Sequence, residues 1–151
     1  MTVYINGVAQ VGAAPTKEFF AHAGNGDELY TFHSFPGYRI DAQDENAEIG
    51  FYVPQDFTSI TEAVVVIYAV ATATHRFHFY SSYGAEGEAL NTHGAGVDDQ
   101  DVVMTASFVH EVDISGILAD LAAGDYVGIV VWGADVNVPN VMVMGVRLKY
   151  S

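Results

Sequence analysis

The segment Ala63-Val64-Val65-Val66-Ile67-Tyr68-Ala69-Val70 carries apolar side chains at every position. Side chains of a strand alternate between its two faces, so an unbroken apolar run is typical of a strand that is covered on both sides. One face of such a strand packs on the core of the domain, and the other packs on a further layer or on a neighbouring subunit. The segment therefore predicts a central strand.

Shorter runs rich in Val, Ile, Phe and Tyr lie on both sides of this segment, and clusters of Gly, Asn, Asp and Pro separate them. This spacing is typical of a β-sandwich or barrel. The sequence predicts strands at 19–23, 29–33, 38–41, 47–53, 63–70, 75–82, 102–114, 126–132 and 141–150, with turns at 24–27 and around 36–37. Residues 115–122 predict one short helix, because Ser115 can cap its start and Gly124 can follow its end. The predicted fold is all-β, a jelly-roll-like antiparallel β-sandwich with one short helix.

The chain has 151 residues, which corresponds to one domain. Its first part ends in Val11-Gly12-Ala13-Ala14-Pro15-Thr16, a small-residue stretch that cannot form a core. We therefore predict an N-terminal arm or linker at residues 1–16 and a sandwich domain at residues 17–151.

Acidic side chains outnumber basic ones by 19 to 5, for a formal net charge of −14. Five cationic side chains cannot build a surface that neutralises phosphates, so the sequence predicts neither nucleic acid nor a membrane as partner. The chain has no cysteine, which excludes disulfides, thiolate nucleophiles and cysteine-ligated metals.

Metal binding depends on which side chains share a face or a loop. His75 and His78 are three residues apart in a predicted strand, so they point to opposite faces and cannot chelate one ion together. The acidic run that contains Asp98, Asp99 and Asp101 is a candidate calcium site, because hard cations take closely spaced carboxylate oxygens. Its alternative interpretation is a solvated loop of an acidic protein.

No motif for covalent catalysis or phosphate binding occurs in the sequence. A pair of carboxylates for glycoside hydrolysis is set by the fold, and the sequence singles out no such pair. We therefore predict a protein that is not an enzyme and that has no cofactor apart from the candidate calcium ion.

Aromatic residues make up 13% of the chain and concentrate in the predicted strands. We expect Phe77, Phe79 and Phe108 to belong to the core. Exposed aromatic rings can stack on sugars, and Tyr80 and Tyr83 are the best candidates because small polar residues and Gly84 surround them.

Several segments resemble small jelly-roll virion proteins of tailed bacteriophages. The resemblance lies in the segments at 53–66, 112–115, 121–129 and 144–151, which include Val53-Pro54-Gln55-Asp56-Phe57 and Ala123-Gly124-Asp125-Tyr126. It implies a structural protein on the virion surface, most specifically a capsid decoration protein that stabilises a phage head. It also implies a homo-oligomer such as a trimer, with the major capsid protein or another virion protein as partner.

Three interpretations of the function follow. In the assembly interpretation, the oligomer or particle interface is formed by Val3, Tyr4, Ile5, Val64, Val66 and Tyr68. In the alternative, the chain is a carbohydrate-binding or receptor-binding module of a fibre or spike tip, which uses Tyr80, Tyr83 and Trp132 with calcium at 98–101. A small hydrolase is a third interpretation and requires a pair of catalytic acids.

Overall fold

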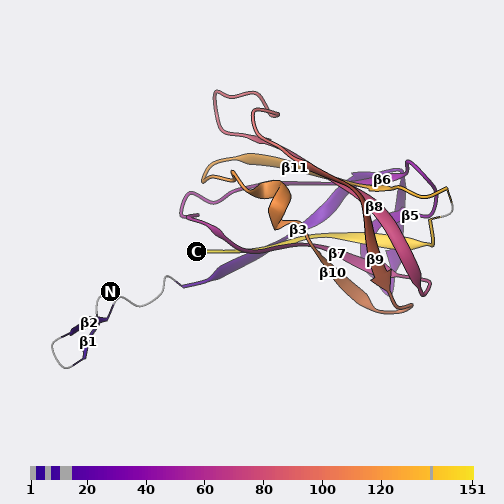
Figure 1. Cartoon of the computed structure of the whole chain (residues 1–151), viewed down its shortest axis with the longest axis horizontal. Coiled ribbons are helices and arrows are strands. Elements are labelled where there is room, and N and C mark those ends of the chain that lie inside the picture. The colour runs from indigo at the N-terminus through magenta and orange to yellow at the C-terminus, as the bar shows by residue number, and fades with distance from the viewer. Residues whose placement is uncertain (1–2, 6–7, 11–14, 137) are drawn as a thin grey trace.

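The computed structural model describes residues 3–5, 8–10, 15–136 and 138–151, and it is an antiparallel β-sandwich with one helical turn (Figure 1). The sequence-based prediction of the fold class is therefore confirmed. The sandwich consists of β3 (Lys17–Gly26), β4 (Glu28–Phe32), β5 (Phe35–Ile40), β6 (Asn46–Tyr52), β7 (Ile60–Ala69), β8 (Ala73–Gly84), β9 (Gly96–Met104), β10 (Val109–Asp113), η1 (Ser115–Leu118), β11 (Tyr126–Gly133) and β12 (Val141–Tyr150).

Two facing sheets share the long strand β3. The first half of β3 pairs with β12, which pairs in turn with β7, and β7 pairs with β10. From Ala23 onward, β3 pairs with β6 of the second sheet, with a bulge between Ala23 and Asn25. The second sheet continues from β6 through β11 and β8 to β9. The hairpin β4–β5 extends the first sheet beside β12.

The core lies between the sheets and follows the period-two pattern of the strands. On β7, Ala63, Val65, Ile67 and Ala69 are fully buried and point inward. The central position predicted for this segment is confirmed, since β7 lies between β10 and β12. From the second sheet, His75 is also fully buried, and its ring stacks on Phe77 at a centroid distance of 5.9 Å.

Two predicted turns are wrong because the backbone turns elsewhere. Residues 24–26 belong to β3, where the bulge bends the strand from one sheet to the other. Pro36 and Gly37 lie inside β5, and the hairpin turn falls at His33 and Ser34, whose φ angles are 46° and 68°. Two consecutive positive φ angles are the geometry of a two-residue hairpin turn.

The predicted strand at 102–114 is two strands in different sheets, because the chain turns at 105–108 with a φ of 67° at Ser107. The predicted helix is a single 3-10 turn, and Ser115 lies inside it, after an N-cap residue, Ile114, that makes no capping hydrogen bond. Instead, the Asp113 carboxylate accepts the Ser115 N–H at 2.9 Å. Gly124 does lie beyond the helical turn, with a φ of 89° that only glycine adopts without strain.

The predicted arm contains a separate two-stranded sheet of β1 (Val3–Ile5) and β2 (Val8–Gln10). The side chains of Val3, Tyr4 and Ile5 lie outside the described part of the chain, so their role in an interface stays a prediction. No described helix has the length and hydropathy needed to cross a membrane.

Candidate functional site

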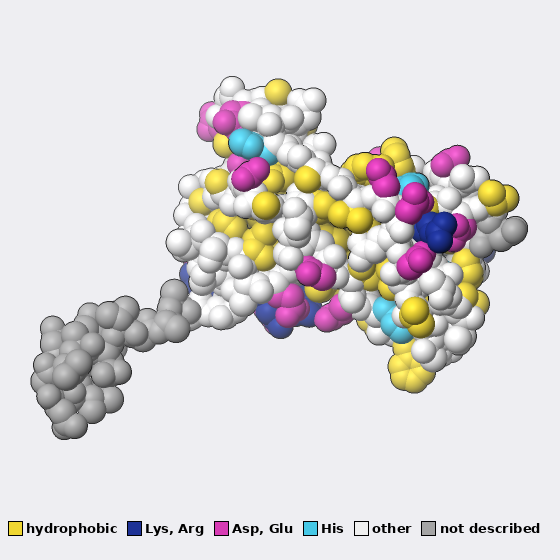
Figure 2. All heavy atoms as spheres, viewed as in Figure 1, with side chains coloured by type: hydrophobic (Ala, Val, Ile, Leu, Met, Phe, Trp, Pro, Cys, Tyr) yellow, Lys and Arg dark blue, Asp and Glu magenta, His cyan; other side chains and the backbone are white. Residues whose placement is uncertain are grey.

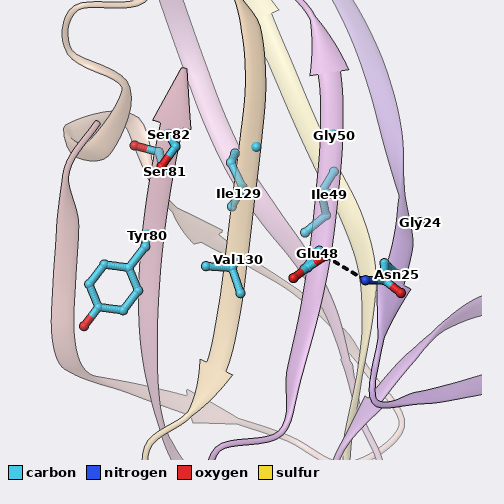
Figure 3. A pocket seen from close by; sticks show the side chains of 11 residues that line it. Gly24, Asn25, Glu48, Ile49, Gly50, Tyr80, Ser81, Ser82, Ile129 and Val130 are labelled. Carbon is cyan, nitrogen blue, oxygen red and sulfur yellow. Dashed lines mark hydrogen bonds between the residues drawn. The ribbon is translucent and has the colours of Figure 1, made fainter. Parts of the chain in front are cut away.

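The outer face of the second sheet has a row of small residues across its middle strands. Gly128 of β11 lies opposite Gly50 of β6 on one side and Ser82 of β8 on the other. A Cβ added to either glycine would have no heavy atom closer than 3.8 Å, so the space above both is open. A cavity of about 370 Å³ lies here, which we call the trough (Figure 3). Its outward lining consists of Gly24, Asn25, Glu48, Gly50, Tyr80, Ser82, Gly128 and Val130.

Aromatic pairs stand on both sides of the trough. Tyr52 and Tyr126 are opposite each other, two residues beyond the glycines, with ring centroids 5.1 Å apart. They are 43% and 53% exposed. On the other side, Tyr80 contacts Trp132 edge to face at 5.5 Å, and Trp132 is 38% exposed. The outward positions of β11 are Tyr126, Gly128, Val130 and Trp132, so each aromatic pair has one member on β11, on opposite sides of Gly128.

Tyr80 is held in place by the neighbouring strand. Gly96 lies opposite it in β9, and a Cβ at Gly96 would collide with the Tyr80 ring. The Tyr80 hydroxyl donates a hydrogen bond to the Asp98 carboxylate, which raises the pKa of Tyr80. The Tyr80 ring therefore lies over β9 in a fixed position and forms one side of the trough.

Polar groups lie at the β3 end of the trough. Asn25 Nδ2 donates a hydrogen bond to Glu48 Oε2 at 2.7 Å, and both side chains are exposed (Figure 3). The remaining Glu48 oxygen can accept a hydrogen bond from a ligand hydroxyl, because an ionised carboxylate has several acceptor positions. This end of the trough is thus equipped for hydroxyl groups.

The structure brings two of the three predicted ring residues together and separates the third. Tyr80 and Trp132 form the pair described above. The expectation that Tyr83 is exposed is wrong, because it points inward and is 1% exposed. Its hydroxyl accepts the Asp120 N–H at 3.2 Å, and burial raises its pKa.

The three phenylalanines predicted for the core are not all buried. Phe77 and Phe79 are buried as expected, with 0% and 1% exposure. Phe108 is 61% exposed, so its assignment to the core is wrong. The physical reason is that Phe108 lies in the turn between β9 and β10, which belong to different sheets.

The predicted calcium residues lie on β9 and engage protein groups. Asp98 accepts the Tyr80 hydroxyl, and Asp101 accepts Arg76 Nε at 2.9 Å. The backbone N–H of Asp99 donates to His78 Nδ1 at 3.1 Å. Among the described residues, no group of three His, Cys, Asp or Glu side chains is placed to hold a metal ion. Calcium binding at Asp98, Asp99 and Asp101 stays a prediction.

The face of β7 predicted for assembly is largely covered by the chain itself. Val64 and Val66 are 6% and 7% exposed, and Arg147 lies opposite Val64 in β12. The guanidinium of Arg147 contacts carboxylates of β7 and β10 on this face. Tyr68 is half-buried and packs on Phe32 with centroids 4.6 Å apart. These residues leave little free surface for a partner.

Comparisons with known proteins give low similarities. No protein-family model matches the chain, and no curated protein matches it significantly. A family 11 carbohydrate-binding module from Clostridium thermocellum, in complex with a β-1,3-1,4-mixed-linked tetrasaccharide, aligns with a TM-score of 0.49 and 10% identity, covering 91% of this chain and 90% of that one. A mannan-recognising carbohydrate-binding module, TmCBM27, aligns with a TM-score of 0.42 and 12% identity, covering 89% and 88% of the two chains. At these values neither structure assigns a function to this chain.

Proposed function

We propose that the chain is a non-catalytic carbohydrate-binding module that holds a neutral glycan in the trough. The observation that carries the proposal is the register of Gly50, Gly128 and Ser82 between two aromatic pairs. Glycine in the middle of a strand lowers its stability and often marks a place where a ligand comes close. Two facing glycines with open space above them fit that description.

The surroundings suit the two kinds of surface of a sugar ring. A pyranose has C–H groups on its faces, which pack against aromatic rings, and hydroxyl groups around its edge. Tyr126 and Trp132 supply exposed rings on opposite sides of the floor. Glu48, Asn25 and Ser82 supply hydrogen-bonding groups between them.

The charge of the site favours a neutral ligand. None of the described residues that line the trough is Lys or Arg, whereas Glu48 contributes a carboxylate. On the face seen in Figure 2, acidic side chains are spread over a mainly uncharged surface. With a net charge of −14 on the chain, uronic acid polymers are repelled more than neutral polysaccharides.

The test is a binding panel of soluble glucans, mannans and xylans, with polygalacturonate as the anionic comparison, measured by affinity electrophoresis and calorimetry. The matched pair of variants is Trp132→Ala in the site and Phe108→Ala outside it. Trp132 is 38% exposed; on a side chain of about 250 Å², this leaves about 95 Å² for a ligand to cover.

Covering half to all of that area is worth about 1.2 to 2.4 kcal/mol. We therefore expect Trp132→Ala to weaken binding to the best neutral glycan by about 7- to 50-fold. Phe108→Ala should leave the affinity unchanged. Absence of binding to every neutral glycan, or equal affinities for the two variants, would contradict the proposal.

A further inference from the structure

A second, smaller hollow lies on the far side of the Tyr52–Tyr126 pair. Its volume is about 210 Å³, and its lining consists of Tyr52, Gln55, Ala85, Glu86, Ala123, Gly124 and Tyr126. We call it the side pocket. The two tyrosines belong to its wall and also flank the trough, so a ligand that stacks on them lies beside both spaces.

One wall of the side pocket is fixed by the turn before β11. The Gly124 N–H donates to the Val53 carbonyl at 3.0 Å, and the buried Asp125 carboxylate accepts the Ala122 N–H at 2.8 Å. A Cβ at Gly124 would lie 3.0 Å from Gln55 Nε2. Glycine at this position therefore leaves room beside the Gln55 amide.

The opposite wall is fixed by the start of the loop after β8. The Glu88 carboxylate accepts the Ala85 N–H at 3.0 Å, and the Ala85 carbonyl accepts the Glu88 N–H at 3.1 Å. This local turn holds Ala85 and Glu86 beside the pocket. Both walls are thus defined by hydrogen bonds within the chain, independent of any ligand.

Polar groups of the side pocket suit hydroxyl groups. Gln55 Nε2 donates to the Tyr52 hydroxyl. The Gln55 side chain is exposed, so its amide oxygen and its second N–H are accessible to a ligand. Glu86 adds an exposed carboxylate, which accepts hydroxyl donors and repels anionic groups.

The size of the side pocket indicates what it can hold. Sites for whole small molecules usually measure about 300 to 1,000 Å³. The trough falls within this range, whereas the side pocket at about 210 Å³ falls below it. The side pocket therefore suits a substituent of a ligand that is held elsewhere.

We propose that the side pocket binds a neutral sugar branch carried by the glycan in the trough, so that the module prefers a branched chain to the same chain without branches. This inference rests on the proposed function, because the trough must first hold the main chain. The branch passes over the two rings and meets Gln55 and Glu86 with its hydroxyl groups.

The experiment compares matched pairs of oligosaccharides by calorimetry on the full chain. One pair is mannopentaose with and without a galactosyl branch, and the other is cellotetraose with and without xylosyl branches. The pocket variant is Ala85→Leu, which fills the space but leaves the backbone hydrogen bonds of the turn in place. Ala119→Leu, beyond η1, is the control for an added leucine.

We expect at least one branched member to bind fivefold or more tightly than its unbranched partner. Ala85→Leu should remove this preference and leave the unbranched affinity and the melting temperature unchanged. Ala119→Leu should keep the preference. Equal binding of branched and unbranched chains would overturn the side-pocket inference alone, whereas no binding of these chains or of any neutral glycan in the panel above would overturn the proposed function as well.

Discussion

A substitution that fills the floor of the trough tests ligand binding independently of stability, and it does so better than the removal of an aromatic ring. Gly128→Val adds a branched side chain at a position where the nearest heavy atom to a new Cβ, the Ser82 carbonyl oxygen, is 3.8 Å away. Gly128 is not among the described residues with a positive φ, so valine meets no backbone strain there. Strand interiors favour valine over glycine by about 0.5 to 1 kcal/mol. The variant should therefore be at least as stable as the natural chain.

The effect on binding has the opposite sign. The valine methyl groups raise the floor, and a ligand lifted by even 0.5 to 1 Å loses roughly a quarter to a half of its dispersion contact with each atom below. The lifted ligand also loses its position between Tyr126 and Trp132, and a tenfold weakening corresponds to about 1.4 kcal/mol. We expect a loss of tenfold or more in affinity for the best neutral glycan.

Two measurements on the same sample decide the outcome: urea unfolding for stability and calorimetry for affinity. Thr31→Val places the same side chain on an exposed position of β4 and should change neither result. If Gly128→Val folds stably and still binds with unchanged affinity, the trough is not the ligand site.

Three further predictions concern other parts of the chain. Burial lowers the pKa of His75 below its unfolded value of about 6.5. The stability contributed by the neutral ring is therefore complete above that pH and falls, by at most about 1.4 kcal/mol per pH unit, as the pH drops below it. Urea unfolding between pH 5 and pH 8 should show this dependence of stability on pH, and His75→Phe should remove it. Tyr83→Phe should cost about 1 kcal/mol of stability through the lost Asp120 hydrogen bond and leave glycan affinity intact, and a selective loss of affinity would contradict its place in the core. If the arm drives assembly, deletion of residues 1–16 should convert an oligomer to a monomer in light scattering, whereas an unchanged mass would argue against this role.

The sequence predicted the sandwich because its strands carry strong local signals. The apolar run at 63–70 has no polar alternation, and β7 is accordingly central and covered on both faces. Bends and breaks were harder to predict. Gly24 and Gly26 predict a turn, yet β3 continues through them because its two halves pair with different sheets.

The residues of the proposed site were predicted in part, and the errors have physical reasons. Tyr80 and Tyr83 are three positions apart in one strand, so period-two alternation requires them to point to opposite faces. That rule correctly separates His75 from His78, and it would also have separated the two tyrosines. The trough itself depends on the register of Gly50 with Gly128, which pairs strands far apart in sequence. Glycine inside an apolar strand was the one local signal for it.

The predictions that concern assembly remain open to experiment. The resemblance to virion proteins implies a virion surface location, self-association and a capsid partner. The proposed glycan-binding role of the trough is compatible with the fibre-tip alternative, in which the chain would contact a host surface. The arm deletion described above tests self-association separately from the binding site.

The shared strand β3 has a consequence for solubility. Because it joins the two sheets into one path of paired strands, that path ends at β9 and β10, while the hairpin β4–β5 lies beside β12 and leaves β4 as a further edge. Exposed strand edges can template aggregation, and natural proteins protect them with charge. Here both ends bear carboxylates, with Asp98, Asp99 and Asp101 on β9 and Glu111 and Asp113 on β10. Arg76 pairs with Asp101 and Arg147 with Glu111, so Asp98, Asp99 and Asp113 are the acidic side chains of these two edges without a Lys or Arg partner among the described residues. Two molecules that approach through β9 or β10 therefore bring like charges together, which disfavours pairing along these two edges.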